Sequence, residues 1–378
     1  MKQYIILDIS GKVEKYDNAL FDALCRLDSK ATFRCLMPGK GLFSFIPKKI
    51  KNSENLFKRL IKVLEVLLNY MVICSCLYRK KPEVLHVQWL PLLEFVGWEN
   101  YIFKYFKKKS PSTKYVLTIH NIYPHNMSDR AKISYNIRFR KISKMFDAFI
   151  VHTQNSKVEA VKDFALNDSN VYVCCHGVFE PHNVMIKTKK YIMENINILQ
   201  FGNQSFYKGT DLLVDAICGL DERRKSRVSV NIVGDISPVF LADLKSRDTD
   251  SKINWIPYFL NDDKLYEVIN NSDIIVLPYR AISQSGVLLL SIYFEKLIIC
   301  SNLPSFIETM SLENSKELDD CLFFETENAD SLRKLLIRYI DGNVCVDKLI
   351  NRIKYLKKLY SWDSAAKSTL KVYELNFK

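Results

Sequence analysis

The residues with the clearest potential for chemistry lie in short polar loops that follow predicted strands. The first loop is FGNQSFYKG, residues 201–209, which begins where the apolar run ILQF ends and leads into the helical pattern TDLLVDAI. A helix N-terminus beside Lys208 suits a phosphate group, because free amides and an ammonium group both favour negative charge. The loop is neither a P-loop nor GxGxxG, and a surface loop in which Gly209 relieves a tight turn explains it equally well.

A second loop lies in LPYRAISQSGVLLLSIYF, residues 277–294, between a predicted strand and an apolar helix that starts near Gly286. Glycine at this point allows close approach of a ligand to the backbone. The amides of Ser285, Gly286 and Val287 can then bind a second anionic group. The alternative is a buried helix capped by Ser283 or Ser285, and both roles can hold together.

A third group of candidates follows strands in the first half of the chain. His120 and Asn121 stand at a predicted strand end in YVLTIHNIYPHN. An imidazole there can act as an acid, a base or a hydrogen-bond donor, although a single histidine is more often structural. Trp89, in HVQWLPL, offers a stacking surface or anchors the edge of the sheet. The chain has neither HExxH nor CxxC, so we expect no metal site.

The net charge of +13 belongs to one half of the chain. Residues 1–186 hold 29 Lys/Arg and 16 Asp/Glu, whereas residues 187–378 hold 26 of each. The basic residues interleave with aromatic ones, which fits a solvated face, nucleic acid or an anionic membrane surface. We expect no nucleic-acid partner, because no RNA- or DNA-binding motif accompanies them. Basic amphipathic helices favour the membrane surface.

Strand-like apolar runs alternate with helix-like periodic segments, which predicts parallel sheets covered on both faces. Ligands of such sheets bind beyond the carboxyl ends of the strands. The series restarts near residue 195, so we expect two doubly wound domains, residues 1–185 and 190–360, with a C-terminal helix over 361–378 that packs back on the first. The predicted strands are 4–7, 84–87, 115–119, 148–152, 171–174, 196–201, 228–233, 253–256, 274–278 and 297–300, and the predicted helices include 18–27, 155–164, 209–218, 262–270 and 329–340.

The sequence also bears on the compartment of the protein. The N-terminus lacks the apolar region of a secretory signal, so we expect no signal peptide. Residues 63–78 form the best membrane candidate, but this run contains Glu65 and Asn69 and is shorter than the ~20 residues a span needs. We therefore expect a core or surface helix there. The ten cysteines fit reduced thiols of a cytosolic protein.

Taken together, several segments resemble the family 4 glycosyltransferases of the two-domain GT-B type, over most of the chain. The order and spacing of these segments carry the resemblance. They are His86-x-Gln88-Trp89, Thr118–Asn121 with Pro124-His125, Asp147–Thr153 with Ser156, His176–Val178, Gly202 with Tyr207–Gly209, and Pro278–Arg280 with Ser283–Val287.

The resemblance implies an α/β fold of two Rossmann-like doubly wound domains, with parallel sheets facing across a cleft. It implies retaining transfer of a hexose-type sugar from a nucleotide-sugar, without a metal or other cofactor, to a glycan or polyprenyl-diphosphate-linked acceptor. The second domain would bind the donor and the first the acceptor. Such an enzyme would build a surface polysaccharide such as capsule or O-antigen. It would lie in the cytoplasm, peripheral to the anionic inner face of the membrane.

By position, the resemblance assigns a catalytic role to Lys208, which would neutralise the donor diphosphate, and to His120, which would contact the transferred sugar. It assigns the remaining candidates to the two substrates. The implied donor-binding residues are Gly202, Asn203, Ser205, Lys208, Gly209, Arg280, Ser283, Gln284, Ser285, Gly286 and Val287, and the implied acceptor-binding residues are Trp89, Asn121 and His125.

The sequence departs from the family pattern at several of these positions. Ser283 and Ser291 replace a usual pair of glutamates, and Ser205 replaces an arginine. A subgroup with SQSGVL-type loops lacks the glutamate pair in much the same way. The departures also fit a non-catalytic relative that binds a nucleotide-sugar or serves as a scaffold. An NAD-dependent oxidoreductase is a further alternative, but LDISGKVEKY follows the first strand where GxGxxG would be required.

Overall fold

The computed structural model describes residues 2–45, 56–124, 127–178, 181, 186, 195–248, 250, 252–282, 284–312 and 316–375, with the backbone alone for 56–59. The chain divides into two compact units. One is Met1–Gly177 together with Ser361–Lys378, and the other is Val178–Tyr360.

The N-terminal unit contains a seven-stranded sheet in the order β3-β2-β1-β4-β5-β6-β7. Every pair of neighbouring strands is parallel. The central strands are buried along nearly their whole length, as expected where helices cover both faces. The strands are β1 (Gln3–Asp8), β2 (Thr32–Pro38), β3 (Gly41–Leu42), β4 (Val84–Trp89), β5 (Lys114–Thr118), β6 (Ala148–Val151) and β7 (Val171–Val173).

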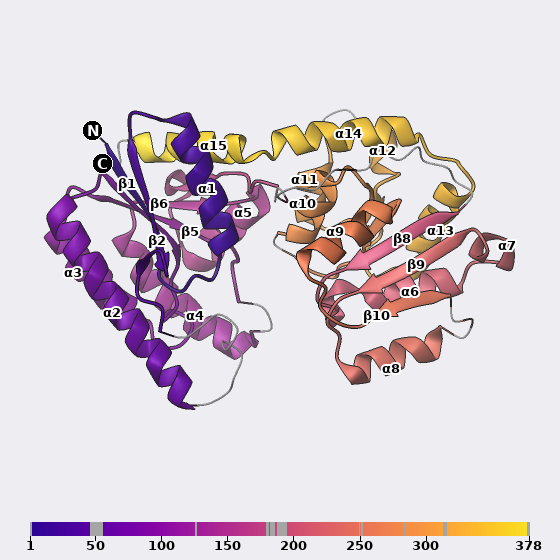
Figure 1. The fold of residues 1–378 in the computed structure, drawn as a ribbon, viewed down its shortest axis with the longest axis horizontal. Helices are drawn as coiled ribbons and strands as arrows, with labels where there is room; N and C mark the ends of the chain where they lie inside the picture. Colours follow the sequence, from indigo (N-terminus) through magenta and orange to yellow (C-terminus); the bar gives the residue numbers. More distant parts are fainter. Residues whose placement is uncertain are drawn as a thin grey trace. The chain divides into compact units, whose positions relative to one another are not determined.

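Two groups of helices cover this sheet. α1 (Glu14–Leu27) and α15 (Trp362–Glu374) pack against each other on one face, so the end of the chain returns to its beginning (Figure 1). Ser361 caps α15 by accepting a hydrogen bond from the amide of Ser364. The other face carries α2 (Leu56–Lys80), α3 (Glu99–Lys109), α4 (Asp129–Ile142) and α5 (Gln154–Phe164), each in contact with the next.

Helix α2 is longer than its sequence pattern predicted, with 25 residues. The stretch Leu60–Lys80 is long and apolar enough to cross a membrane by length and composition alone. Two of its polar residues, Glu65 and Asn69, nevertheless bind protein backbone. The buried Glu65 accepts a hydrogen bond from the amide of Phe45 (2.7 Å), and Asn69 pairs with both backbone groups of Phe43. One face of α2 therefore packs on the N-terminal unit, as expected for a surface helix.

The C-terminal unit contains a six-stranded, all-parallel sheet in the order β10-β9-β8-β11-β12-β13. Helices α6, α8 and α13 pack together on one face, and α10 packs with α14 on the other. The strands are β8 (Ile196–Phe201), β9 (Val228–Val233), β10 (Ile253–Ile256), β11 (Ile274–Leu277), β12 (Leu297–Ser301) and β13 (Phe323–Phe324); the helices are α6 (Thr210–Cys218), α7 (Glu222–Lys225), α8 (Pro238–Arg247), α9 (Asp262–Asn271), α10 (Gly286–Tyr293), α11 (Pro304–Met310), α12 (Lys316–Asp319), α13 (Ala329–Ile340) and α14 (Val346–Leu359).

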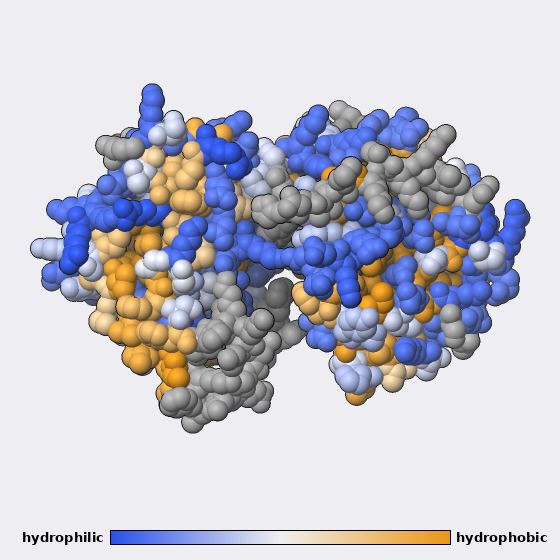
Figure 2. All heavy atoms as spheres, in the orientation of Figure 1, coloured by the Kyte–Doolittle hydropathy of each residue, from blue (hydrophilic) through white to orange (hydrophobic). Residues whose placement is uncertain are grey.

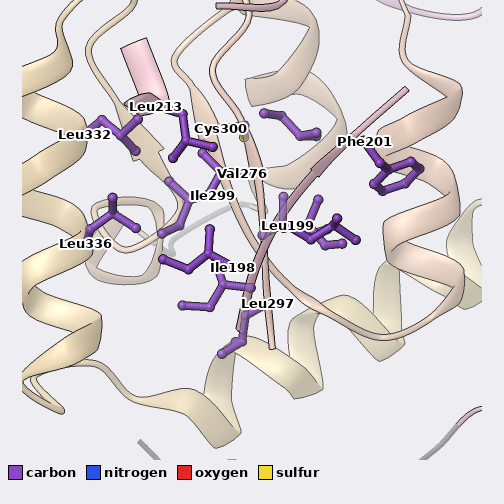
Figure 3. Close-up of a cluster of buried hydrophobic side chains, with 14 of the residues drawn as sticks. Ile198, Leu199, Phe201, Leu213, Val276, Leu297, Ile299, Cys300, Leu332 and Leu336 are labelled. Atoms are coloured by element: carbon purple, nitrogen blue, oxygen red, sulfur yellow. The ribbon is translucent and has the colours of Figure 1, made fainter. Parts of the chain in front are cut away.

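Aliphatic side chains from the central strands fill the core of this unit. Ile198 and Ile299 pack toward Leu213 of α6 and Leu332 of α13, whereas Leu199 points to the other face of the sheet (Figure 3). All five are at most 1% exposed. Such close packing of branched side chains holds the strand ends in place, and the loops that follow them carry the candidate residues.

The two doubly wound parallel sheets confirm the predicted fold class. The predicted strands and helices all form, with ends shifted by at most four residues except at α2, which begins seven residues earlier than predicted. The sequence pattern missed β2, β3 and β13. β2 is an outer strand whose residues alternate between buried and more exposed, and its polar residues dilute the apolar run. β3 and β13 are two residues long, too short for a periodic signal.

We predict that Gly177→Ala destabilises the N-terminal unit. A Cβ at Gly177 would lie 2.3 Å from the Trp362 ring at the start of α15, a rigid neighbour that cannot move aside. Overpacking of this kind costs about 1–3 kcal/mol, which urea unfolding followed by near-UV circular dichroism would measure. The matched control is Gly219→Ala, whose Cβ meets the flexible end of Arg333. Equal stability of both variants would contradict the tight packing of Trp362 on Gly177.

Candidate functional site

The candidate residues form two groups, one at the carboxyl edge of each sheet. In the C-terminal unit the loop after β8 begins with Gly202 (φ 104°) and ends with Gly209 (φ 64°), just before α6. A Cβ at Gly209 would lie 1.8 Å from the carbonyl oxygen of Pro278. Only glycine allows this approach with a positive φ, and the loop after β8 is thereby held against the loop after β11.

Lys208 is a buried cation within this loop, with 7% of its surface exposed. Its Nζ donates a hydrogen bond to the Tyr279 hydroxyl (2.8 Å) and lies 4.6 Å from the centre of that ring. Among the described residues, no carboxylate lies within ion-pair distance of this ammonium group. Burial lowers the pKa of Lys208 to about 8. The loop therefore presents a desolvated positive charge that an anionic ligand would stabilise.

The start of α10 meets the same point. A Cβ at Gly202 would lie 3.1 Å from Lys208 Nζ and 3.4 Å from Val287 Cγ2. Ser285 caps α10, with its hydroxyl accepting from the amide of Leu288 (3.1 Å). The amides of Gly286 and Val287 are in the first turn of this helix, whose N-terminus favours negative charge. The structure thus brings together Gly202, Lys208 and the N-terminus of α10, and gives Ser285 the capping role.

Two buried glutamines, which sequence reasoning missed, hold the loop after β8 in shape. This loop, residues 202–209, is called the lysine loop. Gln200 donates from Nε2 to the carbonyl oxygen of Lys208 (3.1 Å). Gln204 donates to the carbonyl oxygens of Gly202 and Val233 and accepts from the Thr210 hydroxyl. An amide at the end of the buried strand ILQF is unusual enough to have signalled a role for Gln200.

Arg280, a predicted donor-binding residue, has a side chain that neighbouring protein groups bind. Its guanidinium forms two hydrogen bonds with the Asp211 carboxylate (2.9 and 2.7 Å) and one with the carbonyl oxygen of Phe206. It also lies 4.1 Å from the centre of the Phe206 ring. These contacts clamp the lysine loop to the start of α6, so the structure gives Arg280 a positioning role.

The remaining donor-side candidates differ in their placement. Asn203 and Ser205 line a hollow of about 690 Å³, together with Phe206, Asp235 and residues at the start of α8. Gln284 is half-buried beside Ser285, and Ser283 lies outside the described residues. Ser291 is fully buried and donates to the carbonyl oxygen of Val287 (2.7 Å), so it serves the helix.

The acceptor-side candidates line a small pocket at the carboxyl edge of the N-terminal sheet. Trp89, His120 and Asn121 surround it with Gln88 and others, leaving about 40 Å³. Lys12 lies over the Trp89 ring, 5.6 Å from its centre. His125 lies outside the described residues. Three of the side chains that the sequence singled out are thus neighbours.

His120 belongs to a larger buried cluster. Its Nε2 is 3.2 Å from Gln88 Oε1 and its Nδ1 is 3.2 Å from His152 Nε2. Tyr16 of α1, which sequence reasoning missed, makes ring contacts with His120, His152 and His176. Burial, followed by the neighbouring histidines, holds the pKa of His120 well below its usual value. The cluster is therefore neutral at physiological pH.

Another buried histidine lies on β4, next to this cluster. His86 is fully buried, with its ring nitrogens 2.6 Å from the hydroxyls of Tyr373 and Thr118, and it is structural. Within the described ranges, no group of three or more His, Cys, Asp or Glu side chains is arranged to hold a metal ion.

The C-terminal unit, which carries the lysine loop, matches a known protein family. Residues 195–341 match the family model described as glycosyl transferases group 1. This match supports a relationship between the C-terminal unit and that family. No curated protein sequence matches the chain.

Three solved structures illustrate the similarity of the whole chain. A glycosyltransferase from Rickettsia africae ESF-5 has a TM-score of 0.68 at 19% identity, covering 99% of this chain and 97% of that one. The lipopolysaccharide outer core galactosyltransferase WaaB, in its apo form, has 0.65 at 13%, covering 98% and 99%. Anabaena Alr3699/HepE in complex with UDP-glucose has 0.64 at 11%, covering 99% and 100%.

The fold is that of the GT-B glycosyltransferases. Both Rossmann-like sheets take part in this similarity, because the matches span nearly the whole of each chain. In this GT-B chain the two groups of candidate residues lie one in each unit, at corresponding edges of the two sheets.

We predict that Asp17→Asn stabilises the protein increasingly as pH rises. Asp17 is fully buried, and no described group donates a hydrogen bond to either carboxylate oxygen. Burial, then the Asp8 charge, raises the pKa of Asp17 to about 9. The folded state must keep this proton while the unfolded state releases it near pH 4, so the native Asp17 is destabilising between pH 4 and 9. The advantage of the Asn variant should grow by about 1 kcal/mol per pH unit in that window.

Urea unfolding of both proteins at pH 5, 6, 7 and 8 would measure this difference. Asp22→Asn, on the exposed side of the same helix, is the matched control and should leave the difference flat. An Asp17→Asn advantage that stays constant with pH would show that the native carboxyl is ionised.

Proposed function

We propose that the protein is a retaining glycosyltransferase. It moves a hexose-type sugar from a nucleotide-sugar to a glycan or lipid-linked oligosaccharide acceptor during synthesis of a surface polysaccharide. The observation that carries this proposal is the buried Lys208 ammonium, which lies beside the N-terminus of α10 without a carboxylate partner among the described residues. The group 1 match over residues 195–341 supports the same reaction class.

The chemistry of the reaction fits this arrangement. The bond between the sugar C1 and the diphosphate oxygen breaks, C1 bonds to an acceptor hydroxyl oxygen, and a nucleoside diphosphate and a proton leave. Negative charge develops on the diphosphate, so a preorganised cation in a desolvated site lowers the barrier. We propose that Lys208 supplies this charge, assisted by the amides of Gly286 and Val287, and that no metal ion is needed.

The similar structures support the substrate class. One of them is Anabaena Alr3699/HepE in complex with UDP-glucose, and another is WaaB, a lipopolysaccharide outer core galactosyltransferase. By analogy we propose a nucleotide-sugar donor here, contacted by Asn203 and Ser205 in the hollow at the start of α8. On the acceptor side we propose that His120 contacts the transferred sugar, flanked by Trp89 and Asn121.

We predict that Lys208→Met abolishes donor binding and sugar transfer while the protein stays folded. Methionine fills the space without the charge, so the diphosphate would lose its buried counter-ion. A thermal-shift screen against UDP-, GDP-, ADP- and dTDP-sugars would identify the donor, since binding to the folded state alone raises Tm. Titration calorimetry and transfer assays would then compare the variant with the wild type.

The matched control is Lys296→Met, which removes another buried lysine of the same unit. Lys296 donates to the carbonyl oxygens of Asn270 and Ser272, so its loss should lower stability and leave donor affinity intact. Unchanged transfer by Lys208→Met would refute the proposed role. Sugar transfer or slow donor hydrolysis by the wild type would eliminate the alternative of a non-catalytic nucleotide-sugar-binding relative.

We further propose that the N-terminal unit binds the anionic inner face of the cytoplasmic membrane. α2 and α3 enclose an apolar groove of about 930 Å³, lined by residues that include Met71, Tyr78, Tyr101 and Tyr105. These four side chains are between 47% and 72% exposed. Figure 2 shows hydrophobic residues gathered along this part of the unit. Exposed apolar area of this kind marks an interaction surface.

Basic residues border the groove, which favours a bilayer with anionic headgroups as the partner. Lys104, Lys108 and Lys109 on α3 are exposed, and Arg79 and Lys81 lie at the end of α2. Lys107 forms an ion pair with Asp147 (2.6 Å) and is therefore excluded from this set. Apolar side chains would enter the headgroup region while the lysines contact the phosphates.

We predict salt-sensitive binding to vesicles that contain phosphatidylglycerol. Replacing Lys104, Lys108 and Lys109 together with glutamine should weaken binding by at least about tenfold, because each basic residue near the lipid contributes ~1 kcal/mol. Met71→Glu should weaken it as well, by placing a charge in the groove. Co-sedimentation would measure both effects, with Val239→Glu on the C-terminal unit as the control. Equal binding to neutral vesicles, or none, would contradict the proposal.

A further inference from the structure

A chain of hydrogen bonds crosses the carboxyl edge of the N-terminal sheet. The strands β4, β5, β6 and β7 are neighbours, and one residue near the carboxyl end of each takes part. The Cys174 carbonyl oxygen is 3.0 Å from His152 Nδ1, and His152 Nε2 is 3.2 Å from His120 Nδ1. His120 Nε2 is 3.2 Å from the side-chain amide of Gln88. The side chains of this row are at least partly buried, with Gln88 and His152 at most 6% exposed.

The Cys174 carbonyl oxygen, at one end of this row of hydrogen bonds, determines which ring nitrogens carry protons. A carbonyl oxygen only accepts hydrogen bonds, so His152 must carry a proton on Nδ1. The Cys174 carbonyl is itself held in place, because the Cys174 amide donates to the Val151 carbonyl oxygen (2.9 Å). In a neutral His152, Nε2 then has a lone pair and accepts from His120. His120 consequently carries its proton on Nδ1, and its Nε2 has a lone pair.

We propose that His152 is a positioning residue that fixes His120 in the Nδ1–H tautomer. The Nε2 atom of His120 is then a hydrogen-bond acceptor beside the pocket that Trp89 and Asn121 line. The consequence for catalysis rests on the proposed function, whereas the tautomer itself does not. A sugar hydroxyl bound at this position would donate to Nε2 in place of the Gln88 amide, because the nitrogen has a single lone pair. The opposite tautomer would present an N–H donor instead.

The surroundings of both rings support the neutral state that this reasoning requires. Burial lowers the pKa of His152 to about 4. Burial also holds the pKa of His120 well below its usual value, and the nearby His152, His176 and His86 lower it further. Tyr16 packs against both His120 and His152 and fixes their ring planes.

Gln88 completes the row and must be oriented to match. With a lone pair on His120 Nε2, the Gln88 side chain turns its NH₂ group toward His120. The oxygen and nitrogen of a glutamine amide are assigned from hydrogen bonding. In the orientation shown by the structure, Oε1 faces His120, so His120 Nε2 would have to donate and its Nδ1 would have to accept from His152. His152 would then need N–H groups on both ring nitrogens, and a buried imidazolium is unfavourable without a counter-charge.

Nitrogen-detected NMR of the full chain, labelled with ¹⁵N-histidine, tests the tautomer directly. We expect His120 to show a protonated Nδ1 and an unprotonated Nε2 between pH 6 and 8, with the signal assigned through a His120→Gln variant. The result that would overturn the proposal is a protonated Nε2 in the wild type. This measurement needs no substrate, so it remains decisive even if the protein transfers no sugar.

Two substitutions of His152 separate its hydrogen bonds from its bulk. His152→Leu fills the space without polar atoms and should leave His120 as a mixture of tautomers. We expect kcat to fall about tenfold, as it does when the hydrogen-bond partner of a metal-bound histidine is removed. The KM for the donor should change little. His152→Gln supplies a donor and an acceptor on one side chain, and should keep the Nδ1–H tautomer and most of kcat. An unchanged His120 tautomer in folded His152→Leu, verified by circular dichroism, would refute the role of His152.

Discussion

The structure of the candidate site depends on one constraint, the close approach of the Gly209 backbone to the Pro278 carbonyl. This contact holds the loop after β8 against the loop after β11, and it places the Lys208 ammonium between Tyr279 and the start of α10. A buried ammonium group without a carboxylate partner is unfavourable in the free protein. The hydrogen bonds of Gln200 and Gln204, and the clamp of Arg280 on Asp211, hold the loop in that conformation.

In the N-terminal unit, by contrast, the buried histidines at the edge of the sheet are neutral. There, burial suppresses charge on His86, His120, His152 and His176, and hydrogen bonds between neighbouring strand ends orient the rings. Exposed basic residues of this unit instead border the apolar groove between α2 and α3. One unit thus uses a local buried cation, whereas the other combines a neutral polar edge with a basic exterior. This division fits the proposed binding of the donor by the C-terminal unit and of the acceptor by the N-terminal unit.

Sequence reasoning predicted the fold well because doubly wound sheets have strong local signals. Apolar runs such as ILQF and helical periodicity over 329–340 are set by burial on both faces of the sheet. The same reasoning brought Trp89, His120 and Asn121 together through the rule that strand ends carry the ligands. It missed Tyr16 and the role of His152, because their importance comes from contacts between segments distant in the chain.

The sequence by itself determined the two-part organisation, the parallel sheets and the loops that carry Lys208 and His120, since each follows from local pattern and composition. Only the tertiary structure decided what those side chains do. Three features depend on how strand ends and loops are placed in the fold. They are the ion pair of Arg280 with Asp211, the cap formed by Ser285, and the hydrogen-bonded row from Cys174 to Gln88. The packing of each sheet against its helices sets these distances, and a shift of about an ångström would break the hydrogen bonds. No local sequence pattern encodes such distances.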